Sequence, residues 1–313
     1  FLLAMRFSKA FDESENLGKT LITKNESLRR FVPQEFIYLL HRIEADEVML
    51  GDQVQQDMSI MYADIREFTS LAEQLGAAKT FDFLNDYFGR VGEVIRRHGG
   101  FIDKYLGDGF IALFPGSPDD ALGAAVGIQR AVNEFNVTRS DWTTPPIEIG
   151  IGLNFGPLIL GTVGEEQRMD TTVIADSVNL CSKLEGLCKE YGKGTIVPVE
   201  FLDRISNPGQ YHWRRLGLLR VQDKKKPVDT VHVYDGLTET DFRLFDTTRD
   251  RFENAVLLYD EGDREEAFAA FRALASENPG DPAIMTFLSG RRNGGIPVLF
   301  DRLHVQVDWK AGV

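Results

Sequence analysis

Residues 99–114 read GGFIDKYLGDGFIALF, and this stretch decides the fold class. It contains two apolar runs, Phe101 to Tyr105 and Phe110 to Phe114, that are short enough to be strands. The glycines of Leu106-Gly107-Asp108-Gly109 between them favour a tight hairpin turn. A third apolar run, Met58 to Ile65, precedes the hairpin and suits a buried strand.

Helices and strands alternate around this hairpin. Residues 78–98 place apolar side chains on one stripe of a helix, at Phe81, Leu84, Phe88, Val91 and Ile95. A second helix is expected over Pro118 to Phe135, and a strand over Ile147 to Asn154. The order strand, helix, hairpin, helix, strand is the βαββαβ unit, so the sequence predicts a ferredoxin-like domain of the α+β class.

Further elements are predicted after this unit. A helix is expected over Asp176 to Tyr191. Short strands are expected near Thr195 to Val197, Trp213 to Leu219 and Thr230 to Tyr234. These elements would extend the βαββαβ unit without changing its class.

The C-terminal part has a different character. Residues 251–287 are expected to form two helices, which separate at Glu261-Gly262-Asp263. Three positions match the later half of a tetratricopeptide-like repeat: Ala267, Phe271 and Pro279. Because one repeat cannot form a stable solenoid, we expect an appended helical hairpin.

The N-terminal part is predicted to contain a membrane exit and a dimerising helix. Phe1 to Phe7 is mostly apolar and turns basic, as at the cytoplasmic end of a transmembrane helix; the alternative is an ordinary buried helix start. A three-four spacing then runs through Phe7, Ala10, Ser14, Leu17, Leu21, Lys24, Leu28 and Phe31. We interpret it as a coiled-coil seam, the alternative being a lone amphipathic helix. Pro33 to Leu40 is expected to form a short amphipathic helix.

Composition restricts the class of protein. The 313 residues leave room for one large domain and two smaller parts, which we place at residues 1–44, 45–237 and 238–313. A net charge of −13 argues against nucleic-acid binding, because there is no basic excess to neutralise phosphates. Cys181 and Cys188 would lie two helical turns apart, about 10 Å, which is too far for a disulfide and indicates a reducing, cytosolic compartment.

Two aspartates are candidate metal ligands. Asp64 ends the first predicted strand, and Asp108 lies in the hairpin turn. The first and third strands of a βαββαβ unit pair, so both carboxylates would lie at neighbouring strand ends. Two carboxylates with phosphate oxygens are ligands that Mg²⁺ prefers, and two such ions can activate a hydroxyl group and neutralise a phosphoryl group. Either aspartate alone could be a helix cap or a turn residue; their paired placement favours the metal site.

Three segments together resemble the signature blocks of class III adenylyl and guanylyl cyclases. They are residues 62–69 (YADIREFT), 99–109 (GGFIDKYLGDG) and 172–180 (TVIADSVNL). The blocks have the family's order and spacing, and the N-terminal part resembles that of bacterial receptor-type cyclases. The resemblance implies an adenylate cyclase that converts ATP to 3′,5′-cyclic AMP and pyrophosphate with two divalent cations, Mg²⁺ or Mn²⁺.

The resemblance also implies a role for each matching residue in binding the metals and the phosphates. Asp64 and Asp108 would bind the metal ions. The backbone from Ile65 to Thr69, including Phe68, would cradle the phosphates. These roles place the metal ions and the triphosphate at the end of the first strand.

Three more residues would bind the nucleoside. Lys104 matches the purine-selecting lysine of adenylyl cyclases, where guanylyl cyclases have glutamate. An ammonium group only donates and adenine N1 only accepts, which favours ATP. Thr172 takes the partner purine position, and Asn179 matches the asparagine that orients the ribose. Without the family motif, the simpler interpretation of Lys104 is a solvated strand residue, and that of Asn179 is an ordinary polar residue at a helix start.

Three positions depart from the family's pattern. Lys183 replaces the transition-state arginine, and it keeps the charge without the planar fork. Gln222 replaces a lysine that contacts the triphosphate, and the lysines at 224–226 are either substitutes or solvated charges. Ala175 replaces a usual glycine. We therefore expect a slow but active enzyme, the alternatives being a pseudo-cyclase that senses nucleotide or a guanylate cyclase.

The resemblance implies a homodimer. In this family Lys104 and Thr172 act from one subunit, together with the two aspartates or with Asn179 from the other. The coiled coil would then set the angle between the two catalytic domains. Because the chain starts at Phe1, we expect a fragment whose membrane-anchored sensor module lies upstream and whose catalytic domain is cytoplasmic.

Overall fold

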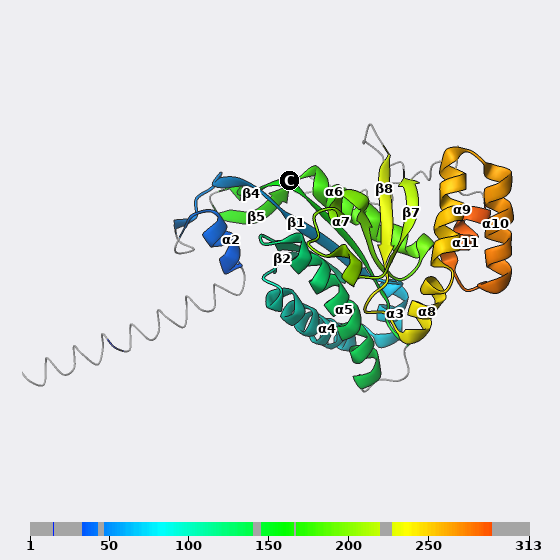
Figure 1. Cartoon of the computed structure of the whole chain (residues 1–313). Coiled ribbons are helices and arrows are strands. Elements are labelled where there is room, and N and C mark those ends of the chain that lie inside the picture. Colours follow the sequence, from blue (N-terminus) through cyan, green and yellow to red (C-terminus); the bar gives the residue numbers. More distant parts are fainter. Residues whose placement is uncertain are drawn as a thin grey trace, which may run out of the picture. The chain divides into compact units, whose positions relative to one another are not determined.

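The computed structural model describes most of the chain, in two compact units (Figure 1). The described residues are 15, 33–42, 47–139, 145–165, 167–219 and 227–289. The smaller unit comprises Phe1–Gln56 and Ile159–Ile174, and the larger unit comprises Asp57–Leu158 and Ala175–Val313. The predicted membrane exit, the coiled-coil seam, Gln222 and the lysines after it lie outside the described residues, so these interpretations stay predictions.

The smaller unit contains a short helix and a strand pair. Helix α2 (Gln34–Leu39) lies where the sequence predicts an amphipathic helix. The end of β4 (Ile149–Glu165) pairs antiparallel with β5 (Arg168–Ile174), which the sequence analysis did not predict. In this pairing Thr172 lies opposite Gly161.

A mixed sheet forms the centre of the fold, and its first strands are those of the predicted βαββαβ unit. They are β1 (Gln53–Ile65), β2 (Phe101–Leu106) and β3 (Gly109–Phe114). The strand order is β2-β3-β1-β4, which continues through β6 (Gly194–Pro198), β8 (Val228–Val233) and β7 (Trp213–Leu219). β1 pairs antiparallel with β3, with Ala63 opposite Phe110. This pairing of the first and third strands confirms the α+β prediction.

One face of the sheet is covered by α4 (Ala77–Arg97) and α5 (Pro118–Thr138), which pack against each other (Figure 1). The start of α5 is fixed locally, because Ser117 Oγ accepts a hydrogen bond from the Asp119 amide at 3.2 Å and Pro118 occupies the first turn. The core under these helices is largely hydrophobic and contains Met61, Val91, Ile95, Phe110, Phe114 and Ile128.

A second core lies between α6 (Asp176–Tyr191), strands β6 and β7, and the C-terminal helices (Figure 1). The C-terminal helices are α8 (Glu239–Asp246), α9 (Arg249–Glu261), α10 (Arg264–Glu277) and α11 (Pro282–Leu288). The side chains of α9, α10 and α11 complete this core together with those of α6, and its members include Leu184, Leu216, Phe252, Phe271 and Phe287. These three helices therefore share a hydrophobic core with the sheet.

A buried ion pair joins the start of α11 to the sheet. Arg214 on β7 and Asp281, the N-cap of α11, both have fully buried side chains. Arg214 Nη2 donates to Asp281 Oδ1 at 2.9 Å, and a second bond joins the same side chains through Nη1. The guanidinium lies over the rings of Phe245 and Phe252, 4.4 and 4.3 Å from their centroids. Burial on all sides makes this contact costly to break.

Several elements differ from the sequence-based expectation. The helix over Asp176–Tyr191 has the predicted bounds, whereas β4 runs well beyond the predicted Asn154. The unpredicted elements are short: α3 (Phe68–Leu75), α7 (Val199–Leu202), α8, α11 and a 3₁₀ helix over Pro208–Gln210. None of the helices in the described part of the chain is long and apolar enough to span a bilayer.

Candidate active site

Asp64 and Asp108 meet where β1 ends beside the β2–β3 hairpin. Gly107 has a φ of 70°, so the turn uses the left-handed backbone conformation that glycine tolerates best. Gly109 has no room for a side chain, because a Cβ there would lie 2.7 Å from both Ala63 O and Asp64 Oδ1. The hairpin glycines thus allow the turn that carries Asp108 to approach Asp64 closely.

The two carboxyl groups are electrostatically coupled. Each carboxyl group acts on the pKa of the other, and the Ile65 amide also acts on the pKa of Asp108. Burial first, and then the charge of Asp108, raises the pKa of Asp64 to about 7. Burial also raises the pKa of Asp108. Two carboxylates held this close do not both ionise readily without a nearby positive charge.

This pair fits a divalent cation. A cation would neutralise the mutual repulsion that otherwise favours a shared proton. Within the described residues, no group of three or more His, Cys, Asp and Glu side chains could hold a metal ion. Asp64 and Asp108 would therefore bind metal together with phosphate, water or main-chain oxygens, which is the ligand set that Mg²⁺ commonly takes.

The negative charge of these carboxylates also acts on two tyrosines. Burial, followed by the charge of Asp64, raises the pKa of Tyr62 to about 12. Tyr87 on α4 is fully buried, and its pKa is also raised, by burial and then by Asp64 and Asp108. Both phenols therefore stay neutral at physiological pH and add no further negative charge to the site.

The turn after Asp64 leads into the short helix α3. Glu67, the residue before this helix, has a φ of 52°, a left-handed backbone conformation that is strained for residues other than glycine. The amides of Phe68 and Thr69 head the helix, where no preceding helical carbonyl can accept them. Such amides suit phosphate oxygens, in agreement with the expected cradle from Ile65 to Thr69.

The purine-selecting candidates lie on different elements. Lys104 is on β2 opposite Ile111, after a bulge at Asp103. The Lys104 side chain is 33% exposed, and its Nζ lies 3.7 Å from Asp103 Oδ2. Thr172 lies on β5 in the smaller unit. Their expected joint action on one purine stays a prediction.

Asn179 and Lys183 lie on α6, one helical turn apart and so on one face. Asn179 is exposed and Lys183 is partly exposed. The helix packs very closely on β4, because a Cβ on Gly152 would lie 2.0 Å from Cys181 O. Cys181 and Cys188 are free and buried on this packed side.

The family follows from comparison with known proteins. The family model for the adenylate and guanylate cyclase catalytic domain matches residues 50–231, more than half of the chain. The chain belongs to this cyclase family. The match spans the two aspartates, Lys104, Thr172 and α6.

Relatives and solved structures agree with this assignment. An adenylate cyclase of Anabaena cylindrica is 38% identical over 223 residues, which are 69% of this chain and 44% of that protein. A bacterial light-regulated adenylyl cyclase structure has a TM-score of 0.63 at 23% identity, and covers 76% of this chain and 69% of that one. The guanylyl cyclase Cya2 has a TM-score of 0.51 at 32% identity, and covers 61% and 96%. The cyclase chain spans less than half the length of the first curated relatives it matches.

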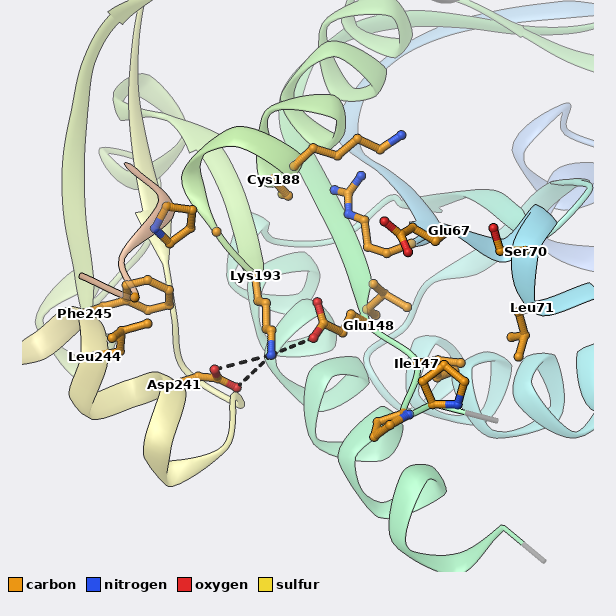
Figure 2. Close-up of a pocket in the computed structure, with 18 of the residues that line it drawn as sticks. Glu67, Ser70, Leu71, Ile147, Glu148, Cys188, Lys193, Asp241, Leu244 and Phe245 are labelled. Atoms are coloured by element: carbon orange, nitrogen blue, oxygen red, sulfur yellow. Dashed lines mark hydrogen bonds and ion pairs between the residues drawn. The ribbon is translucent and has the colours of Figure 1, made fainter. Parts of the chain in front are cut away.

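A cavity of 780 Å³ lies in the larger unit of the cyclase. Its walls come from α3, the start of β4, the end of α6 and the C-terminal helices (Figure 2). Lys193 crosses it and forms ion pairs with Glu148 at 2.7 Å and Asp241 at 3.4 Å. These ion pairs link α8 to the residue that precedes β4, and the start of α3 and the C-terminal helices line the same cavity.

Sequence reasoning missed two residues of the cyclase near its site. Arg66 follows Asp64 by two positions, and its guanidinium forms an ion pair with Glu185 of α6 at 2.8 Å. The pair joins residues 119 positions apart, so no local pattern predicts it. The available signal was the spacing of Gly150 and Gly152, because glycines on one face of a strand often mark a close approach.

Proposed function

We propose that this cyclase converts ATP to 3′,5′-cyclic AMP and pyrophosphate. The observation that carries the proposal is that Asp64 and Asp108 interact electrostatically where the β2–β3 hairpin closes on the end of β1, just before the helix-heading amides of α3. The adenylate cyclase of Anabaena cylindrica supports ATP as the substrate. Because the chain is also similar to a guanylyl cyclase, the choice between ATP and GTP depends on the purine-selecting residues.

The residues divide the reaction between them. Asp64 and Asp108 would hold two divalent cations, Mg²⁺ or Mn²⁺, which supply charge neutralisation and an acidified ribose hydroxyl. The backbone from Ile65 to Thr69 would hold the phosphates. The O3′–Pα bond then forms as the bond between the α- and β-phosphates breaks, pyrophosphate leaves, and the hydroxyl proton is lost to solvent.

Four side chains would orient the substrate. Lys104 would donate to adenine N1, and the Thr172 hydroxyl would accept from the adenine amino group. Asn179 would position the ribose, and Lys183 would stabilise charge that develops on the α-phosphate. All four lie within the match to the family model.

We further propose that the site forms between two copies of the chain. Lys104 and Thr172 of one copy would act with the aspartates or Asn179 of the other. The N-terminal seam would join the copies and relay a signal from an upstream membrane-anchored sensor to the cytoplasmic catalytic domains. The heptad spacing from Phe7 to Phe31 supports this part of the proposal.

Substrate choice tests the proposed function. The unchanged protein should have a higher kcat/KM for ATP than for GTP, because Lys104 can donate to adenine N1 but faces a proton on guanine N1. Lys104→Glu with Thr172→Cys should lower the ATP-to-GTP ratio of kcat/KM by at least about a hundredfold. Equal use of both nucleotides by the unchanged protein would exclude this assignment and favour a guanylate or mixed cyclase.

A second test concerns Lys183. Lys183→Arg should raise kcat by up to about tenfold and leave KM nearly unchanged, because a planar fork contacts the developing charge better than an ammonium does. Steady-state kinetics with ATP measures both constants. An unchanged kcat would show that Lys183 does not contact the transition state, whereas no turnover by either protein would favour a pseudo-cyclase that only binds nucleotide.

A further inference from the structure

Arg66 makes three separate contacts that tie the metal-bearing end of β1 to its neighbours. Its Nη1 lies 2.8 Å from Glu185 Oε1, and its Nη2 donates to the main-chain oxygen of Glu185 at 2.7 Å. Its own amide donates to Glu148 O at 2.8 Å. The side chains of Arg66 and Glu185 are only 13% and 6% exposed. The contact is therefore a shielded ion pair reinforced by a main-chain bond.

Strand β4 has glycines where the Arg66–Glu185 contact needs space. A Cβ on Gly150 would lie 1.8 Å from Arg66 Nη2 and 2.6 Å from Glu185 Oε1. Gly152, two residues along the same face, gives α6 its close approach to β4. Any side chain at Gly150 would displace the guanidinium, so the ion pair depends on a residue of a third element.

The pair connects the two halves of the proposed site. Arg66 lies between the metal ligand Asp64 and the amides that head α3. Glu185 lies on α6, two residues after Lys183 and six after Asn179. Neither side chain has a role in the proposed reaction, yet each is fixed next to residues that do.

The ion pair with Glu185 also determines where the positive charge of Arg66 lies. The charges of Glu185 and Arg66 both act on Asp64, in opposite directions, and the charge of Asp108 acts on Glu185. Without Glu185, the guanidinium would lose its ion-pair partner while its charge still acted on Asp64. It would then compete there with a divalent cation.

We propose that Arg66 and Glu185 are a positioning pair that holds α6 in register with the metal-binding end of β1 and keeps the guanidinium from the metal-binding aspartates. The proposal rests on the proposed function, because the aspartates are its metal ligands. Neither residue is a catalytic residue, since both act through the groups they hold in place.

The test compares Glu185→Gln with the double variant Arg66→Gln/Glu185→Gln in the full chain. Mn²⁺ binding is measured by electron paramagnetic resonance with a non-cyclisable ATP analogue, and kcat is measured at saturating Mn²⁺. Glu185→Gln should weaken Mn²⁺ binding by about tenfold, because the guanidinium loses its charge partner and keeps only its bond to the main-chain oxygen of residue 185. The double variant should recover most of the Mn²⁺ affinity, because the competing charge is gone. In both variants kcat should fall about ten- to a hundredfold, because the ion pair no longer fixes α6 against the end of β1.

A matched control is Asp229→Asn, which breaks the partly buried Arg215–Asp229 pair at 2.9 Å between β7 and β8. It should leave Mn²⁺ affinity unchanged. If Glu185→Gln does not fold, the double variant still tests the proposal, because it leaves neither member of the pair charged and unpaired. A lowered kcat with normal Mn²⁺ affinity in the double variant would support the proposed positioning role.

Two results overturn the inference: wild-type kcat in the folded double variant, or equal loss of Mn²⁺ affinity in the single and double variants. Failure of the proposed function looks different. In that case the unchanged protein forms no cyclic AMP, while Mn²⁺ affinity still depends on Glu185.

Discussion

Asp64→Ala and Asp108→Ala should each lower ATP turnover by about a thousandfold or more, because one carboxylate cannot hold two divalent ions. The fold should survive both changes. Each change removes one member of a pair in which burial and mutual repulsion raise the pKa of Asp64 to about 7, so no favourable electrostatic interaction within the pair is lost. Turnover is measured with saturating Mn²⁺, and thermal unfolding is measured without metal.

The matched control for this pair is Asp57→Ala, an exposed aspartate on the same strand. It should retain wild-type turnover and thermal stability. Near-normal turnover in a well-folded Asp64→Ala or Asp108→Ala protein would exclude these residues as the metal ligands.

Asp281→Ala should lower the free energy of unfolding by about 3–5 kcal/mol, because it leaves the fully buried Arg214 without its charge partner. The second core would be weakened, since α11 packs on α6 and Thr286 Oγ1 donates to Glu190 O at 2.7 Å. For a chain of this size we expect the Tm to fall by roughly 10 °C. Chemical and thermal unfolding measure the two quantities.

Two further variants separate loss of the pair from other causes. Arg214→Met/Asp281→Ala removes both charges and should be more stable than Asp281→Ala, because no buried charge remains unpaired. Asp250→Ala breaks an exposed contact to Arg249, where the aspartate side chain is 93% exposed, and should change stability by less than about 1 kcal/mol. A Tm unchanged in Asp281→Ala would show that the C-terminal helices do not depend on this pair.

The local parts of the fold could be predicted from the sequence. The turn at Gly107 and Asp108 was predictable because the glycines determine it within four residues. Helix α6 was predictable in its bounds because its apolar period is unbroken and Gly192 ends it. Strand β5 was missed, since Arg168–Ile174 is half exposed and lacks the apolar run that marked the other strands.

Only part of the non-local structure could be predicted from the sequence. The Asp64–Asp108 pairing was predictable because the βαββαβ topology brings those strand ends together, and β1–β3 pairing is what the structure contains. The Arg66–Glu185 and Arg214–Asp281 pairs join residues 119 and 67 positions apart, and no periodicity encodes such contacts. The roles of Lys104, Thr172, Asn179 and Lys183 rest on the family motif, and they stay predictions for enzymology to test.

The most direct measurement is a product analysis of the purified chain supplied with ATP and Mg²⁺ or Mn²⁺, with Asp64→Ala as the blank. Chromatography should recover 3′,5′-cyclic AMP and pyrophosphate in equal amounts, with more product from ATP than from GTP and none above background in the variant. Nucleotide that binds but is recovered unchanged, or equal product from the Asp64→Ala protein, would contradict the assignment of this chain as a metal-dependent adenylate cyclase.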